Sequence, residues 1–329
     1  MRFTNSLRLL LENFKQVARL LVYKSITALV LLALCSALIL PELWEIIEAP
    51  QTAELFSNVK NIFFSVIDHE QGKSPSFYVD AVFGEGGSLN AFLGLIFSLR
   101  WQIVLVCIGC VLVYLLKRFV DSLVHFSVGS TLNDKMATYA DTSFSTTFVE
   151  NLGKASAYAG LYVPVTFLTD VVTLFVACIF LRFLPLGLAL FLSMTLIVVV
   201  QALKLTFTSP WLPAMTTDGK KLKEAIRYEG KLERKQIGKV FMLYAVTVYI
   251  VIIVNVVAAV CTFGSALLLT VPASYFLLIC EQYVIYYTLK GKKYFITYES
   301  IATNPDHGDR AHFFDYIEEV EKQKTEEEK

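Results

Sequence analysis

Six long apolar runs constrain this chain more than any other feature of its sequence. A helix needs about 20 apolar residues to cross a hydrocarbon core roughly 30 Å thick. The runs are continuous and lack the alternation of barrel strands, which indicates helices that satisfy their backbone groups internally. The mean hydropathy of +0.57 also exceeds that of a typical soluble domain. The sequence therefore predicts an all-α integral membrane protein with six transmembrane helices, at about residues 20–40, 95–116, 161–180, 183–202, 240–263 and 266–289.

The charged segments between these runs predict the orientation. Residues 1–24 carry five basic residues and one acid, and residues 204–239 carry nine basic residues and four acids. Residues 41–100 reverse this balance, with eight acids and three basic residues. Because basic residues concentrate in cytoplasmic loops, we expect both termini, residues 117–154 and residues 204–239 on the cytoplasmic side. The lack of a recognisable targeting sequence fits a bacterial cytoplasmic (inner) membrane.

Segments of different character flank the predicted membrane domain, residues 20–289. Residues 1–19 form a predicted interfacial amphipathic helix, and residues 290–329 a polar, acidic cytoplasmic tail that ends in a short helix. Residues 41–94 form a predicted external loop whose first part has apolar residues at helical spacing, as a small cap would. The start of the second span stays open, because a span from Trp101 is short and one from Leu95 contains Arg100.

A four-residue pattern precedes each of the three outward-going spans. Each copy has a carboxamide, an aliphatic residue, Ala or Gly, and then a cation, and each follows an amphipathic segment. This predicts a threefold repeat of an interfacial helix, an outward span and a return span. The alternative is that such patterns recur by chance where helices enter membranes. The copies are Gln16-Val17-Ala18-Arg19, Asn151-Leu152-Gly153-Lys154 and Gln236-Ile237-Gly238-Lys239.

Residues 207–244 carry a resemblance to a known family. An aromatic stretch with proline, Pro210-Trp211-Leu212-Pro213, leads to an Asp218-Gly219 turn and then to a basic amphipathic segment before the next span. This layout resembles the bacterial membrane domain that is fused to some glycerophosphodiester phosphodiesterases, and its stand-alone six-helix relatives. The resemblance implies a six-helix membrane architecture. It carries over no catalytic residue, and the soluble phosphodiesterase domain is absent.

Five polar residues inside the predicted spans form the candidate site: Asp170, Gln201, Asn255, Glu281 and Gln282. A carboxylate at the centre of a spanning helix costs about 2.5–3.5 kcal/mol on insertion scales, so it normally faces protein or water. Asp170 and Asn255 each lie 16 residues beyond the cation of their motif copy, as Cys35 does in the first copy. If Asp170 and Asn255 lie together, they would line a polar cavity or a proton-linked path. The alternative is a structural hydrogen bond between neighbouring helices.

Glu281 and Gln282 lie in the inner part of the last predicted span. Glu281 either pairs with a basic residue at the cytoplasmic face or lines an inward-facing mouth together with Gln201.

The sequence offers no catalytic, cofactor-binding or metal-binding motif. Cys107 and Cys110 have CxxC spacing but lack a second pair of ligands, and all six cysteines fall inside apolar runs. The His/Asp group at residues 306–315 is better explained as a turn followed by a helix from Arg310 that Asp309 caps. The formal net charge of zero argues against a nucleic-acid partner.

These observations favour a non-catalytic membrane component that acts as a scaffold or handles a lipid or small solute. Its partners would be the lipid bilayer and either another protein or a lipid ligand. The alternative is a proton-coupled secondary transporter that uses Asp170, Asn255 and Glu281.

Overall fold

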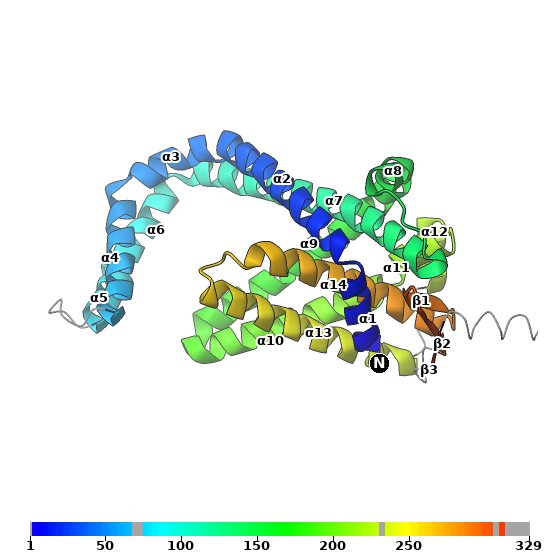
Figure 1. The fold of residues 1–329 in the computed structure, drawn as a ribbon. Coiled ribbons are helices and arrows are strands. Elements are labelled where there is room, and N and C mark those ends of the chain that lie inside the picture. The colour runs from blue at the N-terminus through cyan, green and yellow to red at the C-terminus, as the bar shows by residue number, and fades with distance from the viewer. Residues whose placement is uncertain (1, 68–74, 230–233, 305–308, 313–329) are drawn as a thin grey trace, which may run out of the picture. The chain divides into compact units, whose positions relative to one another are not determined.

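The computed structural model describes residues 2–67, 75–229, 234–304 and 309–312, which are almost entirely helical (Figure 1). Within these residues, seven helices are long and apolar enough to cross a membrane. The chain is therefore an integral membrane protein built from helices.

The helices form two compact units, one of residues 26–117 and the other of residues 1–25 together with 118–329. Two helices contribute to both units: α2 (Phe14–Leu38) and α7 (Arg100–Thr138).

The unit of residues 26–117 contains four short helices between α2 and α7: α3 (Leu40–Glu48), α4 (Pro50–Ile67), α5 (Pro75–Phe83) and α6 (Ser88–Ser98). Proline stands in the first turn of α3, α4 and α5, where a helix needs no backbone donor. Both α5 and α6 pack against α4 and against each other. The predicted external loop is thus mostly helical in its described part.

Length and composition allow seven spans as well as the expected six. The seventh candidate, Ser76–Ser98, combines α5 and α6. The glycine-rich residues 84–87 interrupt it, and Gly86 adopts a φ of +81° that other residues rarely accept.

Helix α7 differs from the predicted second span at both ends. It begins at Arg100, directly after the break at Leu99, and runs for 39 residues, or about 58 Å. The helix continues past residue 116, where the predicted span ends, because its apolar stripe continues while the hydropathy falls. That stripe is buried and keeps four-residue spacing through Val124, Val128, Leu132 and Met136.

The larger unit is organised around α14 (Leu267–Leu289), in which nearly every side chain from Phe276 to Thr288 is buried. Helix α14 packs against α1 (Arg2–Glu12) and α13 (Arg234–Cys261), while α10 (Leu186–Thr208) packs against α13 and α9 (Leu152–Phe183) (Figure 1). The six predicted spans overlap, in chain order, the long helices α2, α7, α9, α10, α13 and α14. The shorter elements are α8 (Phe144–Glu150), α11 (Trp211–Thr217), α12 (Leu222–Glu224) and the π-helical turn η1 (Ala225–Glu229).

The predicted interfacial helix of residues 1–19 is divided. Asn13 separates α1 from α2, and its side-chain amide donates to the carbonyl of Leu9 at 2.9 Å. The apolar face of α1 packs against α14 and strand β1 through the buried Leu9 and Leu10. Helix α1 therefore packs against protein on one side, whereas Leu7 and Leu11 of its predicted interfacial stripe are exposed.

The predicted polar tail begins with a three-stranded antiparallel sheet, β1 (Tyr294–Thr297), β2 (Ser300–Asn304) and β3 (Asp309–His312). Side chains alternate along β1, with Tyr294 and Ile296 buried, which is strand periodicity. The expected helix from Arg310 is wrong, because β3 pairs with β2 over these residues. Residues 313–329 and the His/Asp group at 306–308 lie outside the described residues.

Candidate functional site

The structure places Asp170 in a network that links three helices. Its Oδ2 accepts a hydrogen bond from Arg118 Nη2 at 2.5 Å, and its Oδ1 accepts one from Gln201 Nε2 at 3.0 Å. The carboxylate on α9 is thus paired with a guanidinium on α7 and an amide on α10. Gln201 therefore joins Asp170, and not Glu281 as one alternative expected. Pairing of this kind is how charged groups are accommodated within apolar helices.

Arg118 is a site residue that the sequence does not single out. It stands beyond the predicted end of the second span, among the flanking charges. The long continuation of α7 places it within a helix instead of after one. The signal for this is the buried apolar stripe of α7 beyond residue 118, which hydropathy averaging conceals.

Asn255 belongs to a separate network within the α13–α14 hairpin. Its Nδ2 donates to Ser274 Oγ at 3.1 Å, and its Oδ1 accepts from Thr270 Oγ1 at 2.8 Å. The amide also donates to the Val251 carbonyl one turn earlier. None of these bonds reaches Asp170, so the structure does not join the two residues into the expected cluster.

Glu281 and Gln282 point to different neighbours of α14. Glu281 is fully buried, and its Oε1 accepts from Thr247 Oγ1 of α13 at 2.8 Å, while its Oε2 has no hydrogen-bond partner among the described residues. Gln282 Oε1 lies 3.0 Å from His125 Nε2 on α7, and Gln282 Nε2 donates to the Ser209 carbonyl at 2.7 Å. Among the residues that the structure describes, Glu281 therefore has neither the basic partner nor the Gln201 neighbour that were its expected alternatives.

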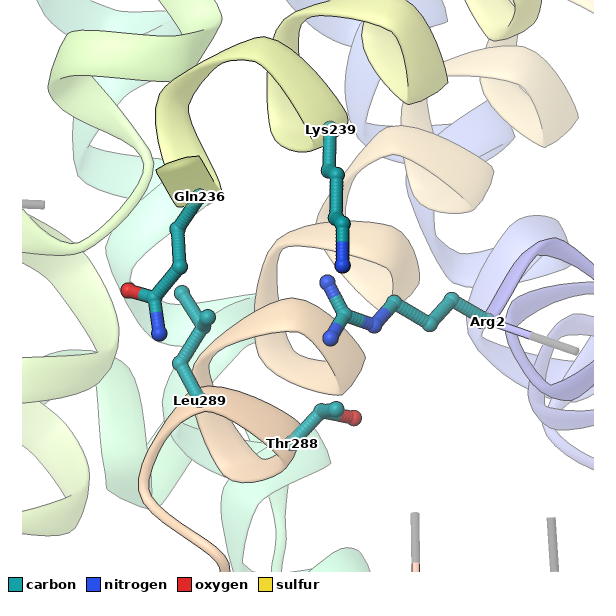
Figure 2. Close-up of a pocket in the computed structure, with 5 residues that line it drawn as sticks. All are labelled: Arg2, Gln236, Lys239, Thr288 and Leu289. Carbon is teal, nitrogen blue, oxygen red and sulfur yellow. The ribbon is translucent and has the colours of Figure 1, made fainter. Parts of the chain in front are cut away.

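A cavity of about 370 Å³ lies where α1, α13 and α14 meet (Figure 2). The residues that line it are Arg2 at the start of α1, Gln236 and Lys239 in the first turns of α13, and Thr288 and Leu289 at the end of α14. Figure 2 shows the Arg2 guanidinium and the Lys239 ammonium group converging on one another from different helices. This described lining contains no carboxylate. Two cations that face a common space form a site for an anion.

Thr288 contributes to the wall of this cavity, but its hydroxyl does not open onto it. The residue is 3% exposed, and its Oγ1 is buried with no hydrogen-bond partner among the described residues. Gln236 lines the same cavity and brings an amide that can donate. The donors that a ligand in the cavity could reach are therefore those of Arg2, Lys239 and Gln236.

The packing of α1 explains how Arg2 reaches this position. Asn5 Nδ2 donates to the Tyr294 hydroxyl at 2.9 Å, and both residues are buried. This bond and the contacts of Leu9 and Leu10 fix α1 against α14 and the sheet. A second cavity of about 290 Å³ is lined by the same two cations together with Phe3 and Leu243.

An acidic residue stabilises the segment that follows α14. Asp218, in the turn after α11, accepts from the Tyr286 hydroxyl at 2.7 Å and pairs with Lys292 Nζ at 2.5 Å. Burial alone would raise the pKa of Asp218, but the hydrogen bonds from Lys292 and Tyr286 and the charges of Lys292 and Lys220 outweigh it. The pKa is therefore lowered. This contact connects the residues before the sheet to the turn before α12.

A third cavity, of about 460 Å³, lies between α7 and the segment that contains α8. Hydroxyl side chains dominate its lining, and Asp134 and Glu150 give it an acidic character. Thr142 Oγ1 donates to Asp134 Oδ2 at 2.9 Å, so part of this polar surface is already satisfied within the protein. The described residues hold no group of three or more His, Cys, Asp or Glu side chains placed to bind a metal.

No protein-family model, curated protein or solved structure matches this chain. The geometry of the cavities and of the paired polar residues therefore carries the functional proposal.

Proposed function

We propose that this chain is a non-catalytic component of a bacterial cytoplasmic membrane that binds an anionic ligand at the Arg2–Lys239 cavity. The single observation that carries the proposal is the convergence of these two cations on a space that Gln236 also lines. Cations that face one cavity from two helices attract an anion, and each charge-assisted hydrogen bond contributes about 1.5–3 kcal/mol.

The intramembrane polar residues support a non-catalytic role. Asp170 is engaged by Arg118 and Gln201, and Asn255 by Ser274 and Thr270. These bonds cross between neighbouring helices, which is how polar side chains stabilise helix packing in membranes. The three cavities are lined by none of Asp170, Asn255 and Glu281.

Part of this proposal is a topology of six crossings with both termini in the cytoplasm. The excess of basic residues in residues 1–24 and 204–239 supports the orientation. The hydrogen bond from the Tyr139 hydroxyl to Glu12 Oε1, at 2.8 Å, supports the count. Glu12 precedes α2 and Tyr139 follows α7, so their contact requires an even number of crossings between them. Helices α2 and α7 supply two, which leaves Ser76–Ser98 outside the count.

The threefold repeat is also part of the proposal. In each of the last two hairpins, the residue 16 positions beyond the motif cation bonds to the return helix: Asp170 to Gln201, and Asn255 to Thr270 and Ser274. Each of these hairpins also follows a short helical segment, α8 in one case and α12 with η1 in the other. Kinship with the phosphodiesterase-associated membrane domain remains a proposal that rests on residues 207–244.

Thermal unfolding of the purified protein in a neutral detergent tests anion binding. The probes are inorganic phosphate, glycerol phosphate and a short-chain phosphatidylglycerol below its micellar concentration, with ionic strength held constant. A ligand at 100 times its dissociation constant stabilises by about 2.7 kcal/mol, so at least one probe should raise the Tm.

Lys239→Gln should reduce this increase by about half or more, since a tenfold weaker ligand at the same concentration stabilises by only about 1.4 kcal/mol. Because Lys239 is exposed, we expect the variant to fold. Lys154→Gln is the matched control, since Lys154 is also exposed and occupies the equivalent motif position on α9. The proposal fails if no probe raises the Tm, or if Lys239→Gln responds as the unaltered chain does.

A proton-coupled transporter is a second candidate, and Glu281 is the observation in its favour. A fully buried carboxyl group with one oxygen, Oε2, that lacks a partner among the described residues is costly unless a proton or a water molecule satisfies it. Infrared spectroscopy should then show a carboxylic C=O band that Glu281→Gln removes and that changes reversibly with pH. A band that is absent in the unaltered protein, or insensitive to pH, would leave Glu281 a packing residue.

A further inference from the structure

We infer that the ligand of the Arg2–Lys239 cavity is the phosphate group of an anionic phospholipid, with its apolar part along the adjoining cavity lined by Phe3 and Leu243. This inference rests on the proposed function and names the chemical class that the site accepts. The shared chemistry is a phosphate ester, which a soluble molecule could also present. Three features of the site favour the lipid.

The first feature is the position of the cavity along its helices. Lys239 directly precedes Val240, where the apolar part of α13 begins, and Leu289 is the last residue of α14 before Lys290. Because α13 and α14 pack against each other as a hairpin, the cavity lies where both helices pass from apolar to charged sequence. In a bilayer this is the level of the lipid phosphates, since basic residues at helix ends reside in the headgroup region.

The second feature is the set of donors. The guanidinium of Arg2 presents a planar set of N–H groups that matches two oxygens of a phosphate, and Lys239 adds a point charge. Gln236, which also lines the cavity, brings an amide that can donate as well. A phosphodiester offers two unesterified oxygens that share one negative charge, so these groups can satisfy both. A headgroup with a cation of its own would bring that cation close to Arg2 and Lys239, so a headgroup without one is favoured.

The third feature is the apolar surface beside the cations. The two cavities share Arg2 and Lys239, and the second continues over Phe3 and Leu243. Leu243 lies one helical turn into the apolar part of α13 from Lys239. Its neighbours Met242 and Val246 are 62% and 51% exposed, so this face of α13 is open to surrounding chains. A soluble phosphate would gain nothing from such a surface, whereas the glycerol and first methylenes of a lipid would.

The test compares three probes on the detergent-purified full chain by calorimetry or by shift in Tm. They are a short-chain phosphatidylglycerol, its headgroup analogue glycerol phosphate, and a phosphatidylcholine of the same chain length. We expect the phosphatidylglycerol to bind at least about tenfold more tightly than either of the others, because it alone uses both the cations and the apolar surface. Arg2→Gln and Lys239→Gln should each weaken its binding by about tenfold or more.

Leu243→Ser separates the lipid from a free phosphate. It should weaken phosphatidylglycerol binding and leave the weaker binding of glycerol phosphate unchanged. Val256→Ser is the control, since Val256 is also exposed on α13 but lies about 20 Å further along the helix. If glycerol phosphate binds as tightly as the lipid, or Leu243→Ser has no effect, the lipid inference is overturned and the anion site stands. If no probe depends on Lys239, the proposed function falls as well. Equal binding of the phosphatidylcholine would overturn the preference for an anionic lipid.

Discussion

At the scale of single residues, pairing explains how this chain holds charged and amide groups among apolar helices. Asp170 is hydrogen-bonded to Arg118 and Gln201, and Gln282 to His125 and the Ser209 carbonyl. The sequence identifies the polar residues, because each is conspicuous in an apolar run. It does not identify their partners, because these lie far away in the sequence. Arg118 and Asp170 are 52 positions apart, and His125 and Gln282 are 157 positions apart, so tertiary packing alone brings each pair together.

Asp218 provides a test of charge pairing outside the apolar helices. Its pKa in the folded protein is lowered, so its contribution to stability is present above the pKa of the unfolded chain, about 3.9 for an aspartate, and is lost as pH falls through the folded value. Asp218→Asn should therefore be less stable than the unaltered protein at neutral pH, and the difference should shrink below about pH 4. Thermal unfolding in detergent across this pH range measures it.

The control for Asp218 is Asp141→Asn, which removes one acidic charge from an exposed position. A difference between Asp218→Asn and the unaltered chain that stayed constant down to the lowest pH would contradict the pairing with Lys292 and Tyr286.

At the scale of elements, the sequence predicts the long apolar helices well. It predicts the short strands and the packing of the amphipathic helix α1 poorly. Continuous apolar runs account for α9, α10, α13 and α14, because burial in lipid requires little more than length and composition. The sheet is not predicted, because its strands are only four or five residues long and their alternation lies within a polar segment. Helix α1 shows the same limit: its amphipathic pattern indicates a buried face but not whether lipid or protein covers it.

Helix α1 therefore offers a direct comparison of two leucines. Leu9 is 1% exposed in the core with α14, and Leu11 on the same helix is 62% exposed. Leu9→Ala should destabilise the protein by about 2–5 kcal/mol, because it leaves a cavity in a packed core. Leu11→Ala should change stability by less than about 0.5 kcal/mol in detergent.

Denaturation in detergent mixtures, followed by tryptophan fluorescence, measures both leucine variants. Equal and small effects of the two substitutions would mean that α1 is held by the bilayer surface and not by α14. In that case the position of Arg2 at the cavity would lose its structural support.

At the scale of the whole molecule, several contacts collect polar residues from distant parts of the chain. Asn5 bonds to Tyr294, Glu12 to Tyr139, and Asn133 to both Thr217 and Tyr287. Arg2, Lys239 and Thr288 line one cavity within the same compact unit. Groups that touch must share a side of the membrane, so these contacts constrain topology independently of the charge count. Hydropathy alone leaves Ser76–Ser98 as a seventh candidate, whereas the Glu12–Tyr139 contact favours six crossings.

Cysteine labelling in sealed vesicles distinguishes six crossings from seven. In a background without the six native cysteines, single cysteines would replace Lys15, Lys60 or Asp141, all of which are exposed. With six crossings, positions 15 and 141 should react on the same side and position 60 on the opposite side. If Ser76–Ser98 also crosses, positions 60 and 141 should react on the same side.

Lys223→Cys supplies the control. It should react on the same side as position 141 in either case, because α9 and α10, which lie between them, cross the membrane as a pair. Reaction of positions 15 and 141 on opposite sides would contradict both the six-crossing topology and the hydrogen bond between Tyr139 and Glu12 on which it rests.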